Sequence, residues 1–371
     1  MFSAFKYIPR LALSPSEMGA YYELPDSDKS RLLPYVPLRG WVASKELKNS
    51  FDKIKEFSGG RKIILDVDYD YIYENKDYLI TGEFPREVFR QLDELLNPDA
   101  GYENWCSLVA EHEWIVPVLQ IRDLSNVLAQ YEVLAGFGRG VVIRFSLADV
   151  ESRSYVEVLD RLLPMIKEDE RILLFFDFGR ISSKVVDNHE VIERYLLDAK
   201  NIASKAYFSV SGSSFPDQFG GREAGSNTIH ERRLFSKLSV TFGNHIIYSD
   251  YASSRFKESG GGGIPIPRID YPTKNDWFFK RERYAESEAV IVDNKKKKYI
   301  EAAKYVVSQD YWVSDLNIWG ERMIMMTSAG EEFAIYNPAK ATSVRVNIHL
   351  YNQIHFTDDL SGRDTDDDWE D

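Results

Sequence analysis

The sequence predicts an α/β fold, a (β/α)8 TIM-like barrel, followed by a mixed α+β appendage at its C-terminal end. Short apolar runs alternate with helix-type segments eight times before residue 257. The clearest run is Arg171–Phe178 (RILLFFDF), in which the next-to-last residue, Asp177, is the only carboxylate. A short apolar run bounded by charge is typical of a strand buried on both faces of a parallel sheet. Eight such units, without a glycine-rich turn after the first, favour a closed barrel over an open doubly wound sheet.

Each expected strand is a short apolar run, and a helix-type segment follows most of them. The strands are expected at Lys6–Leu13, Arg31–Trp41, Lys62–Asp68, Trp114–Arg122, Gly140–Leu147, Arg171–Phe178, Ala206–Phe215 and His245–Tyr251. Between them, apolar residues three or four apart predict amphipathic helices. These helices are expected at Ser44–Phe57, Pro85–Leu96, Leu124–Phe137, Val156–Ile166, Val185–Ala203 and Ile229–Phe242.

The pattern changes from about Lys257, where the four glycines Gly260–Gly263 predict a loop. Beyond the loop we expect strands at Trp277–Arg283, Glu288–Val292 and Thr342–Leu350, and a helix at Lys297–Val307. In the last of these strands, Arg345, Asn347 and His349 would share one face. The expected domains are the barrel over residues 1–256, the appendage over 257–357 and an acidic disordered tail over 358–371.

The composition places bounds on the class of protein. Of the 371 residues, 44% are hydrophobic and 13% aromatic, which is enough for a sizeable core. No apolar run approaches the length of a membrane span, and the N-terminal residues do not resemble a signal peptide. The single cysteine, Cys106, excludes an internal disulfide framework and fits a reducing compartment. We therefore expect a soluble, cytoplasmic protein with no membrane partner.

The charge balance is acidic, with 46 Lys and Arg against 59 Asp and Glu and a net charge of −13. Part of the excess lies in Asp364–Asp371 (DTDDDWED), which contains acidic residues and no basic one. An acidic chain is a poor whole-surface partner for nucleic acid, although a local basic groove stays open as an alternative.

Six short motifs together resemble the beta protein family, which is named after a protein of T-even bacteriophages and is widespread in bacteria and their phages. The motifs are KYIPRL (6–11), LQIR (119–122), GVVIRFSL (140–147), FFDFG (175–179), PRIDYPTKNDW (267–277) and VRVNIHLYNQ (344–353). The resemblance extends over nearly the whole chain. It implies a role in phage–host conflict, because such genes often lie near mobile elements and antiviral defence genes. It brings no assigned reaction.

Polar side chains at the C-terminal ends of the expected strands form the candidate site, because that end of a parallel barrel carries the chemistry. They are Arg39, Asp66, Asp68, Gln120, Arg122, Arg144, Asp177, Ser209, Ser211, Ser249 and Asp250. Among them we assign Asp177 as the catalytic base or ligand-orienting carboxylate, with Asp66 or Asp250 as its partner. The alternative is that these groups only form salt bridges across the mouth of the barrel.

We assign ligand binding to the arginines and the glycine-containing segment at the same C-terminal ends of the expected strands. Arg122 and Arg144 would clamp a phosphate or carboxylate through forked hydrogen bonds. The residues Ser211, Gly212 and Ser213 would present backbone N–H groups to the anion, as loops after the seventh strand of such barrels do. Arg268 and Asp270, from the motif PRIDYPTKNDW, complete the predicted ligand-binding set.

A metal site is the weaker alternative for the same carboxylates. Asp66, Asp68, Asp177 and Asp250 offer oxygen ligands suited to Mg²⁺, but the neighbouring arginines would neutralise them. The histidines have no metal-ligand spacing, and the sequence contains no nucleophile elbow, P-loop or zinc motif. We therefore assign no metal ligand and no cofactor.

Two hypotheses of function follow. In the first, a beta-family protein of phage–host conflict binds an anionic, phosphate-bearing ligand such as a nucleotide at the barrel mouth and, in the fuller form of the hypothesis, hydrolyses it. In the second, the chain is a non-catalytic protein-binding component of a defence or counter-defence complex. The sequence leaves open whether the protein is an enzyme.

Overall fold

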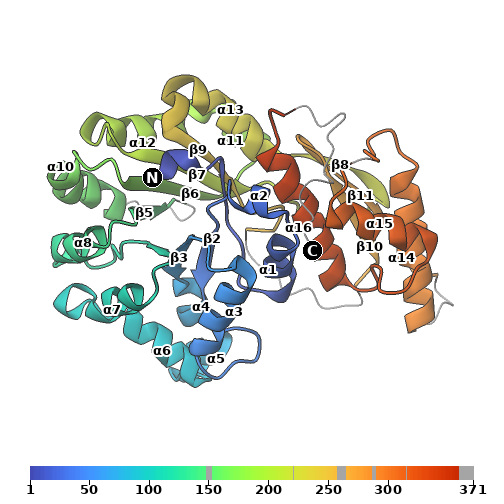
Figure 1. Cartoon of the computed structure of the whole chain (residues 1–371), viewed down its shortest axis with the longest axis horizontal. Coiled ribbons are helices and arrows are strands. Elements are labelled where there is room, and N and C mark those ends of the chain that lie inside the picture. Colours follow the sequence, from blue (N-terminus) through green and yellow to red (C-terminus); the bar gives the residue numbers. More distant parts are fainter. Residues whose placement is uncertain (148–152, 220, 257–264, 286–289, 315, 359–371) are drawn as a thin grey trace.

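The structure is a computed structural model that describes residues 1–147, 153–219, 221–256, 265–285, 290–314 and 316–358. It is an α/β molecule with two parallel sheets and one antiparallel sheet (Figure 1). The predicted glycine loop Gly260–Gly263 lies outside the described residues, as do residues 359–371 of the predicted acidic tail.

All eight predicted parallel strands are present, although most are shorter than their apolar runs. They are β1 (Tyr7–Pro9), β2 (Tyr35–Leu38), β3 (Ile63–Val67), β4 (Ile115–Pro117), β5 (Val141–Ser146), β6 (Ile172–Arg180), β7 (Tyr207–Ser213) and β9 (Ile246–Asp250). A five-stranded sheet has the order β1-β9-β7-β6-β5, and a three-stranded sheet has the order β2-β3-β4. Every pairing in both sheets is parallel.

The prediction of a closed eight-stranded barrel is wrong, because these strands form two separate sheets. Among the described residues, β1 and β2 are joined by the isolated bridges Tyr7↔Leu32 and Arg10↔Tyr35, and β4 and β5 by Val118↔Val142, without a continuous ladder. Both β1 and β4 have three residues and end at a proline, Pro9 or Pro117. Proline has no N–H to donate to a neighbouring strand, so a continuous ladder does not extend across either junction.

The two parallel sheets share an apolar core. One cluster of buried side chains takes residues from strands of both sheets, among them Ile8 of β1, Tyr35 of β2 and Phe175 of β6. The Tyr35 and Phe175 rings stack with centroids 5.1 Å apart. Alternate residues of the same strands, such as Leu174, pack outward into a larger cluster with the surrounding helices. The continuously apolar strands that the sequence shows are therefore buried on both faces.

Helices cover the outside of the parallel sheets (Figure 1). They are α1 (Pro15–Tyr22), α2 (Asp26–Lys29), α3 (Lys48–Ser58), α4 (Tyr69–Tyr73), α5 (Lys76–Thr81), α6 (Glu87–Leu95), α7 (Glu103–Glu111), α8 (Val127–Gly136), α9 (Arg153–Glu157), α10 (Leu163–Ile166), α11 (Ser183–Asp187), α12 (His189–Ile202) and α13 (His230–Phe242). The start of α1 is set by Ser14, whose hydroxyl accepts from the N–H of Glu17, and by Pro15 in the first turn. Among the helices in the described ranges, none combines the length and apolar composition needed to cross a membrane.

The C-terminal part contains an antiparallel sheet of order β10-β11-β8 and three long helices. The elements are β8 (Ala224–Thr228), β10 (Arg268–Pro272), β11 (Asp276–Arg281), α14 (Val292–Val307), α15 (Trp319–Ala329) and α16 (Pro338–Ile354). The strand β8 was not expected, since its sequence, AGSNT, has no apolar alternation. It precedes β9 in the chain yet pairs with β11 beyond the predicted boundary at residue 256, and that boundary stays a prediction.

Two strands predicted in the C-terminal part are not found there. Residues 288 and 289 lie outside the described residues, and Val292 begins α14. The predicted strand Thr342–Leu350 is the middle of α16. That helix is capped by Asn337, whose side-chain oxygen accepts from the N–H of Lys340, and it carries proline in its first turn.

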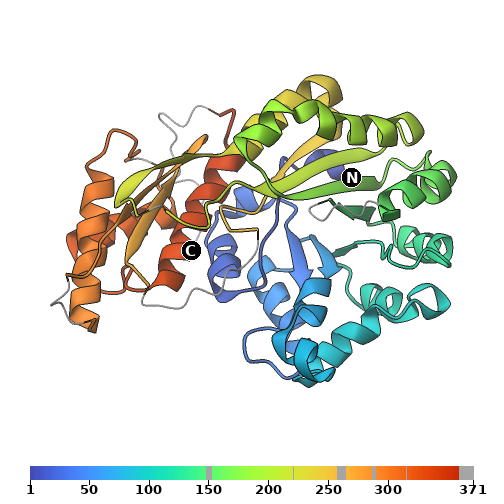
Figure 2. The same ribbon diagram turned by 180° about the vertical axis from the view of Figure 1, so that it is seen from behind.

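Helix α16 lies between the parallel sheets and the rest of the C-terminal part (Figure 1 and Figure 2). All its side chains from Ser343 to Ile354 are buried. Arg345, Asn347 and His349 therefore contact three different elements instead of sharing one face. Arg345 binds β10, His349 binds β9, and the Asn347 amide donates to the carbonyl of Ala20 on α1.

We predict that Gly320→Ala destabilises the protein, because α15 crosses α16 closely at this glycine. An added Cβ would lie 2.6 Å from Cγ1 of Ile348, 2.9 Å from Oδ1 of Asn347 and 3.0 Å from the carbonyl oxygen of Val344. Overpacking of this kind costs about 1–3 kcal/mol of unfolding free energy, which urea denaturation would measure.

The matched control is Gly19→Ala in α1, where an added Cβ meets nothing within 4 Å. It should stabilise the protein by roughly 0.5–1 kcal/mol through helix propensity alone. Equal stability of Gly320→Ala and the wild type would contradict the close crossing.

Candidate functional site

The structure brings four of the predicted site residues, Asp66, Gln120, Arg144 and Asp177, together at the C-terminal ends of β3 to β6. Nη2 of Arg144 lies 2.8 Å from Oδ2 of Asp177, and Nη1 lies 3.6 Å from Oδ2 of Asp66. The side-chain amide of Gln120 donates to Asp66 at 3.0 Å, and the hydroxyl of Tyr35 donates to it at 2.9 Å. One guanidinium therefore joins carboxylates from both parallel sheets.

Asp177 is 1% exposed, and several groups hold it in the ionised form. The hydroxyl of Tyr251 donates to it at 2.8 Å, and the N–H of Gly179 donates at 3.1 Å. Burial acts to raise the pKa of Asp177, but Arg144 and Arg10 outweigh it and the net pKa is lowered. For Asp66 burial prevails, and its pKa is raised. The two carboxylates thus differ in how readily they take a proton.

Asp250 belongs to a second cluster, apart from the first. It accepts hydrogen bonds from the hydroxyls of Tyr7 and Tyr248, from the N–H of Ala252 at 2.7 Å, and lies 2.7 Å from Nε2 of His349. Asp250 and His349 are both buried. Together they join β1, β9 and α16.

A buried glutamate that the sequence analysis missed lies near Asp250. Burial, and after it the charge of Asp250, raise the pKa of Glu231 to about 8. The Glu231 carboxyl accepts hydrogen bonds from the hydroxyl and the N–H of Ser214. Glu231 is therefore protonated at neutral pH, and a neutral carboxyl can be buried beside Ser214 without a cation to balance it.

A cavity of about 790 Å³ opens beside these clusters, and we call it the arginine cavity. It lies where the ends of β1, β2, β3 and β9 meet the C-terminal part. Its lining residues are Arg10, Ala12, Glu17, Arg39, Asp68, Asp70, Tyr71, Glu74, Asn75, Lys76, Phe215, Tyr251, Ser254, Arg255, Phe256, Arg268, Thr342 and Arg345. Its volume is within the range of small-molecule sites.

Arg10 is a partly buried cation of this cavity whose guanidinium has no hydrogen-bond acceptor among the described residues. Its guanidinium lies over the ring of Tyr251, with the carbon atom 4.4 Å from the ring centroid. Within the described part of the chain it makes no hydrogen bond and no ion pair, and its buried Nε has no partner. Burial lowers its pKa while Tyr251 and Asp177 raise it, with a net rise, so Arg10 stays charged.

Two further arginines of the cavity are held by one carboxylate. Nε of Arg268 lies 2.9 Å from Oδ1 of Asp270, and Nη1 of Arg345 lies 3.0 Å from Oδ2. The guanidinium of Arg345 also lies over the ring of Phe215, 4.4 Å from its centroid. Asp270 is buried, does not line the cavity and fixes both arginines in place.

The remaining predicted site residues lie elsewhere. Arg122 is exposed and stacks on the ring of Tyr69, so it does not lie beside Arg144. Ser211, Gly212 and Ser213 belong to β7 and not to the loop after it. The Ser213 hydroxyl donates to the carbonyl of Ser254 at 2.6 Å, and a Cβ on Gly212 would lie 2.5 Å from Cδ1 of Ile181.

No metal centre emerges from this arrangement. Over the ranges that the structure describes, no group of three or more His, Cys, Asp or Glu side chains is placed to hold a metal ion. Asp68 accepts from the N–H of Tyr71 as the cap of α4.

Arg10, Tyr251 and Arg345 are among the cavity residues that the sequence analysis did not assign to the site. Arg10 directly follows the first strand, so the rule that selected Arg144 could have found it. Tyr251 directly follows the last parallel strand, next to the predicted residue Asp250, so the same rule could have found it. Arg345 could not be placed, because its helix was predicted as a strand.

Comparison with known proteins identifies relatives along nearly the whole chain. The family model described as "Beta protein" matches residues 7–355. The chain is 27% identical over 368 residues to the protein named "Protein beta" of Enterobacteria phage P4, which covers 97% of this chain and 96% of the relative. No solved structure matches the chain significantly.

We predict that Arg144→Gln destabilises the protein at pH 7 by about 3 kcal/mol, because it leaves two buried carboxylates without their shared cation. The unfolding free energy from urea denaturation checks this. As the control, Arg90→Gln removes an exposed arginine that pairs with Glu87 on α6, and should leave the stability unchanged. If both variants unfolded at the same urea concentration, the ion network would not be needed to hold the strand ends.

Proposed function

The chain belongs to the beta protein family, whose model covers residues 7–355, and we propose that it binds a phosphate-bearing anion in the arginine cavity and acts in conflict between phages and their hosts. The observation that carries the binding proposal is the guanidinium of Arg10. A charged donor that faces a cavity without a protein partner is costly, unless a ligand supplies the missing acceptor.

The other side chains of the cavity support an anion. Five arginines line it, Arg10, Arg39, Arg255, Arg268 and Arg345. The planar guanidinium group matches the oxygens of phosphate with two parallel hydrogen bonds. Glu17, in the same lining, accepts from the N–H of Ala12 and the hydroxyl of Ser254, and burial raises its pKa. It therefore opposes an incoming anion less than an exposed carboxylate would.

The acidic members of the lining favour a ligand that also carries hydrogen-bond donors. Asp68, Asp70 and Glu74 come from the α4 end of the cavity. Arg268 and Arg345 come from β10 and α16. A nucleotide has both parts, since its phosphate is anionic and its sugar and base donate hydrogen bonds.

We do not extend the proposal to hydrolysis. Asp66, Asp177 and Asp250 do not line the arginine cavity, and hydrogen bonds from the protein engage their carboxylates. A general base needs to reach the proton that it removes. These carboxylates instead support the strand ends from which Arg10 and Tyr251 extend.

The proposed context rests on the relatives. The matching relative is a protein of phage P4, and its similarity extends over nearly the full length of both chains. A shared architecture across that length supports a shared setting, in which phage and host genes compete.

The test is binding of inorganic pyrophosphate to the full chain by isothermal titration calorimetry. We expect Arg10→Gln to weaken binding at least tenfold, about 1.4 kcal/mol, because it removes the cation without a protein partner. Binding should also weaken as the salt concentration rises. The melting temperature of the unliganded variant would show that the fold is intact.

Arg122→Gln is the matched control, since Arg122 is exposed on Tyr69 and does not line the cavity. Its affinity should equal that of the wild type. Wild-type affinity in Arg10→Gln, or an absence of binding in the wild type, would refute anion binding at this site.

Protein recognition is a second candidate function, favoured by an apolar groove on α14 and the segment before α16. The groove has a volume of about 240 Å³ and includes Val292, Ile300 and Tyr336 in its lining. Phe333, also in the lining, is 84% exposed and has a φ of 62°. A left-handed backbone that presents an exposed phenylalanine is strained, and such strain is concentrated at functional positions.

For this candidate we expect a photo-crosslinking analogue at Phe333 to yield one discrete adduct in phage-infected host cells. A second change, Tyr336→Ser, should abolish the adduct because it removes an apolar wall of the groove. The control position is Val240 on α13, which is 87% exposed and outside the groove. Identical adducts from the two positions would mean that the groove recognises nothing specific.

A further inference from the structure

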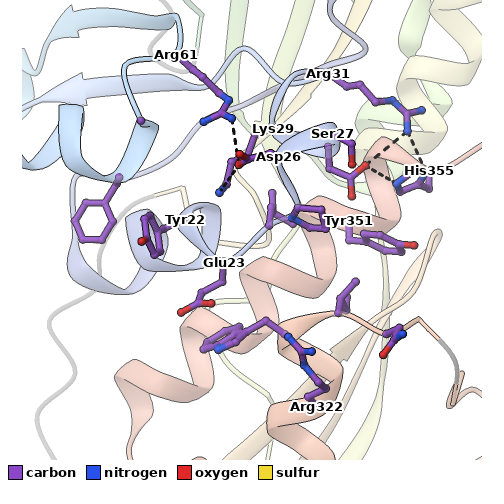
Figure 3. Close-up of a pocket in the computed structure, with 18 residues that line it drawn as sticks. Tyr22, Glu23, Asp26, Ser27, Lys29, Arg31, Arg61, Arg322, Tyr351 and His355 are labelled. Atoms are coloured by element: carbon purple, nitrogen blue, oxygen red, sulfur yellow. Dashed lines mark hydrogen bonds and ion pairs between the residues drawn. The ribbon is translucent and has the colours of Figure 1, made fainter. Parts of the chain in front are cut away.

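A second cavity, of about 760 Å³, lies between helices α1 to α3 and helices α15 and α16 (Figure 3). We call it the aromatic cavity. Its lining residues are Tyr22, Glu23, Leu24, Pro25, Asp26, Ser27, Asp28, Lys29, Arg31, Phe57, Gly59, Arg61, Asn317, Ile318, Trp319, Arg322, Tyr351 and His355. It shares no residue with the arginine cavity, so an inference about it does not depend on the proposed function.

Aromatic rings line both sides of this cavity. On the side of α1 and α3, Tyr22 meets Phe57 edge to face with centroids 6.1 Å apart, and Tyr22 is 53% exposed. On the other side lie Trp319 at the start of α15 and Tyr351 near the end of α16, and Figure 3 shows Tyr351 across the cavity from Tyr22. Of these rings Tyr22 is the exposed one, while Tyr351 is buried and forms part of the cavity wall. An exposed ring in a concave site is suited to cover a flat ligand.

Two cations meet beside these rings. Nζ of Lys29 lies 3.2 Å from Oδ1 of Asp26, and Nη2 of Arg61 lies 3.1 Å from the same oxygen (Figure 3). Lys29 comes from α2 and Arg61 from the segment after α3, and the carboxylate of Asp26 contacts both. The Asp26 side chain is 74% exposed.

The carboxylate of Asp26 stands where an anionic ligand group would bind. The Asp26 carboxylate is exposed whereas Lys29 is buried, so water can solvate Asp26 when a phosphate or carboxylate takes its place beside the two cations. A phosphate or carboxylate in this position can accept two parallel hydrogen bonds from the guanidinium of Arg61. The cations are thus already gathered before a ligand arrives.

The spacing of rings and cations defines the ligand. The ammonium of Lys29 lies 5.3 Å from the ring centroid of Tyr22. A ligand whose flat ring covers Tyr22 therefore needs a short linker between this flat ring and its anionic group, so that the anion can reach Lys29. We propose that the aromatic cavity binds a flat aromatic ring joined to an anionic group, the chemistry shared by nucleoside monophosphates and aromatic carboxylates.

The experiment is isothermal titration calorimetry on the full chain with adenosine monophosphate and, separately, with indole-3-acetate. Adenosine and inorganic phosphate each supply half of the required chemistry, and each should bind at least tenfold more weakly than the better of the two probes. The probe that binds tells a nucleotide from an aromatic carboxylate. If neither probe binds more tightly than these halves, the proposal is overturned.

Variants then assign the site. Tyr22→Ala and Arg61→Gln should each weaken binding of that probe at least fivefold. Asp26→Asn should strengthen it at least twofold, because Lys29 and Arg61 lose the carboxylate that competes with the ligand. A gain of affinity cannot arise from misfolding, so this variant tests the proposal even if the others are unstable.

The surface variant Arg90→Gln is the control, and it should bind the probe as the wild type does. Arg10→Gln reports separately on the arginine cavity. Loss of binding in Arg10→Gln together with wild-type binding in Arg61→Gln would place the ligand in the arginine cavity and overturn the inference. Loss of pyrophosphate binding alone, with the aromatic probe still bound, would affect only the proposed function.

Discussion

The buried carboxylate of Asp250 is the constraint on which the rest of the structure depends. It receives hydrogen bonds from Tyr7 on β1 and Tyr248 on β9, and it pairs with His349 on α16. A buried charge is tolerated only when its partners stay in place, so these three elements must keep their relative positions. Through His349 the carboxylate also fixes the helix that separates the parallel sheets from the C-terminal part.

Both cavities depend on the contact between α16 and the parallel sheets that Asp250 and His349 make. The arginine cavity takes Arg10 and Tyr251 from the strand ends and Arg345 from α16, and the aromatic cavity takes Tyr22 from α1 and Tyr351 from α16. Neither set would meet without the contacts of α16. Such meeting points of two structural parts are common positions of ligand sites. The chemistry of this protein therefore belongs to the contact between its parts more than to either part alone.

The candidate site was predicted in part, and the limits have physical causes. Asp66, Arg144 and Asp177 meet as the rule for parallel strand ends implies. That rule gives the edge of the sheet but not the direction of a long side chain, so Arg122 lies on Tyr69 instead of beside Arg144. The cavity itself depends on α16, whose position is encoded by contacts far apart in the chain.

The sequence by itself determined the parallel strands and their burial, because a strand covered on both faces requires a continuous apolar run. The sequence did not determine whether the strands close into one barrel. Whether Pro9 and Pro117 interrupt a ladder depends on which strands lie beside them. Nor did the sequence decide α16. Alternating polar and apolar residues, as in VRVNIHL, predict a half-exposed strand, yet a helix buried on all sides has no exposed face to set a helical period. Only tertiary structure supplied the partners that satisfy Arg345, Asn347 and His349, and those partners decided the helix.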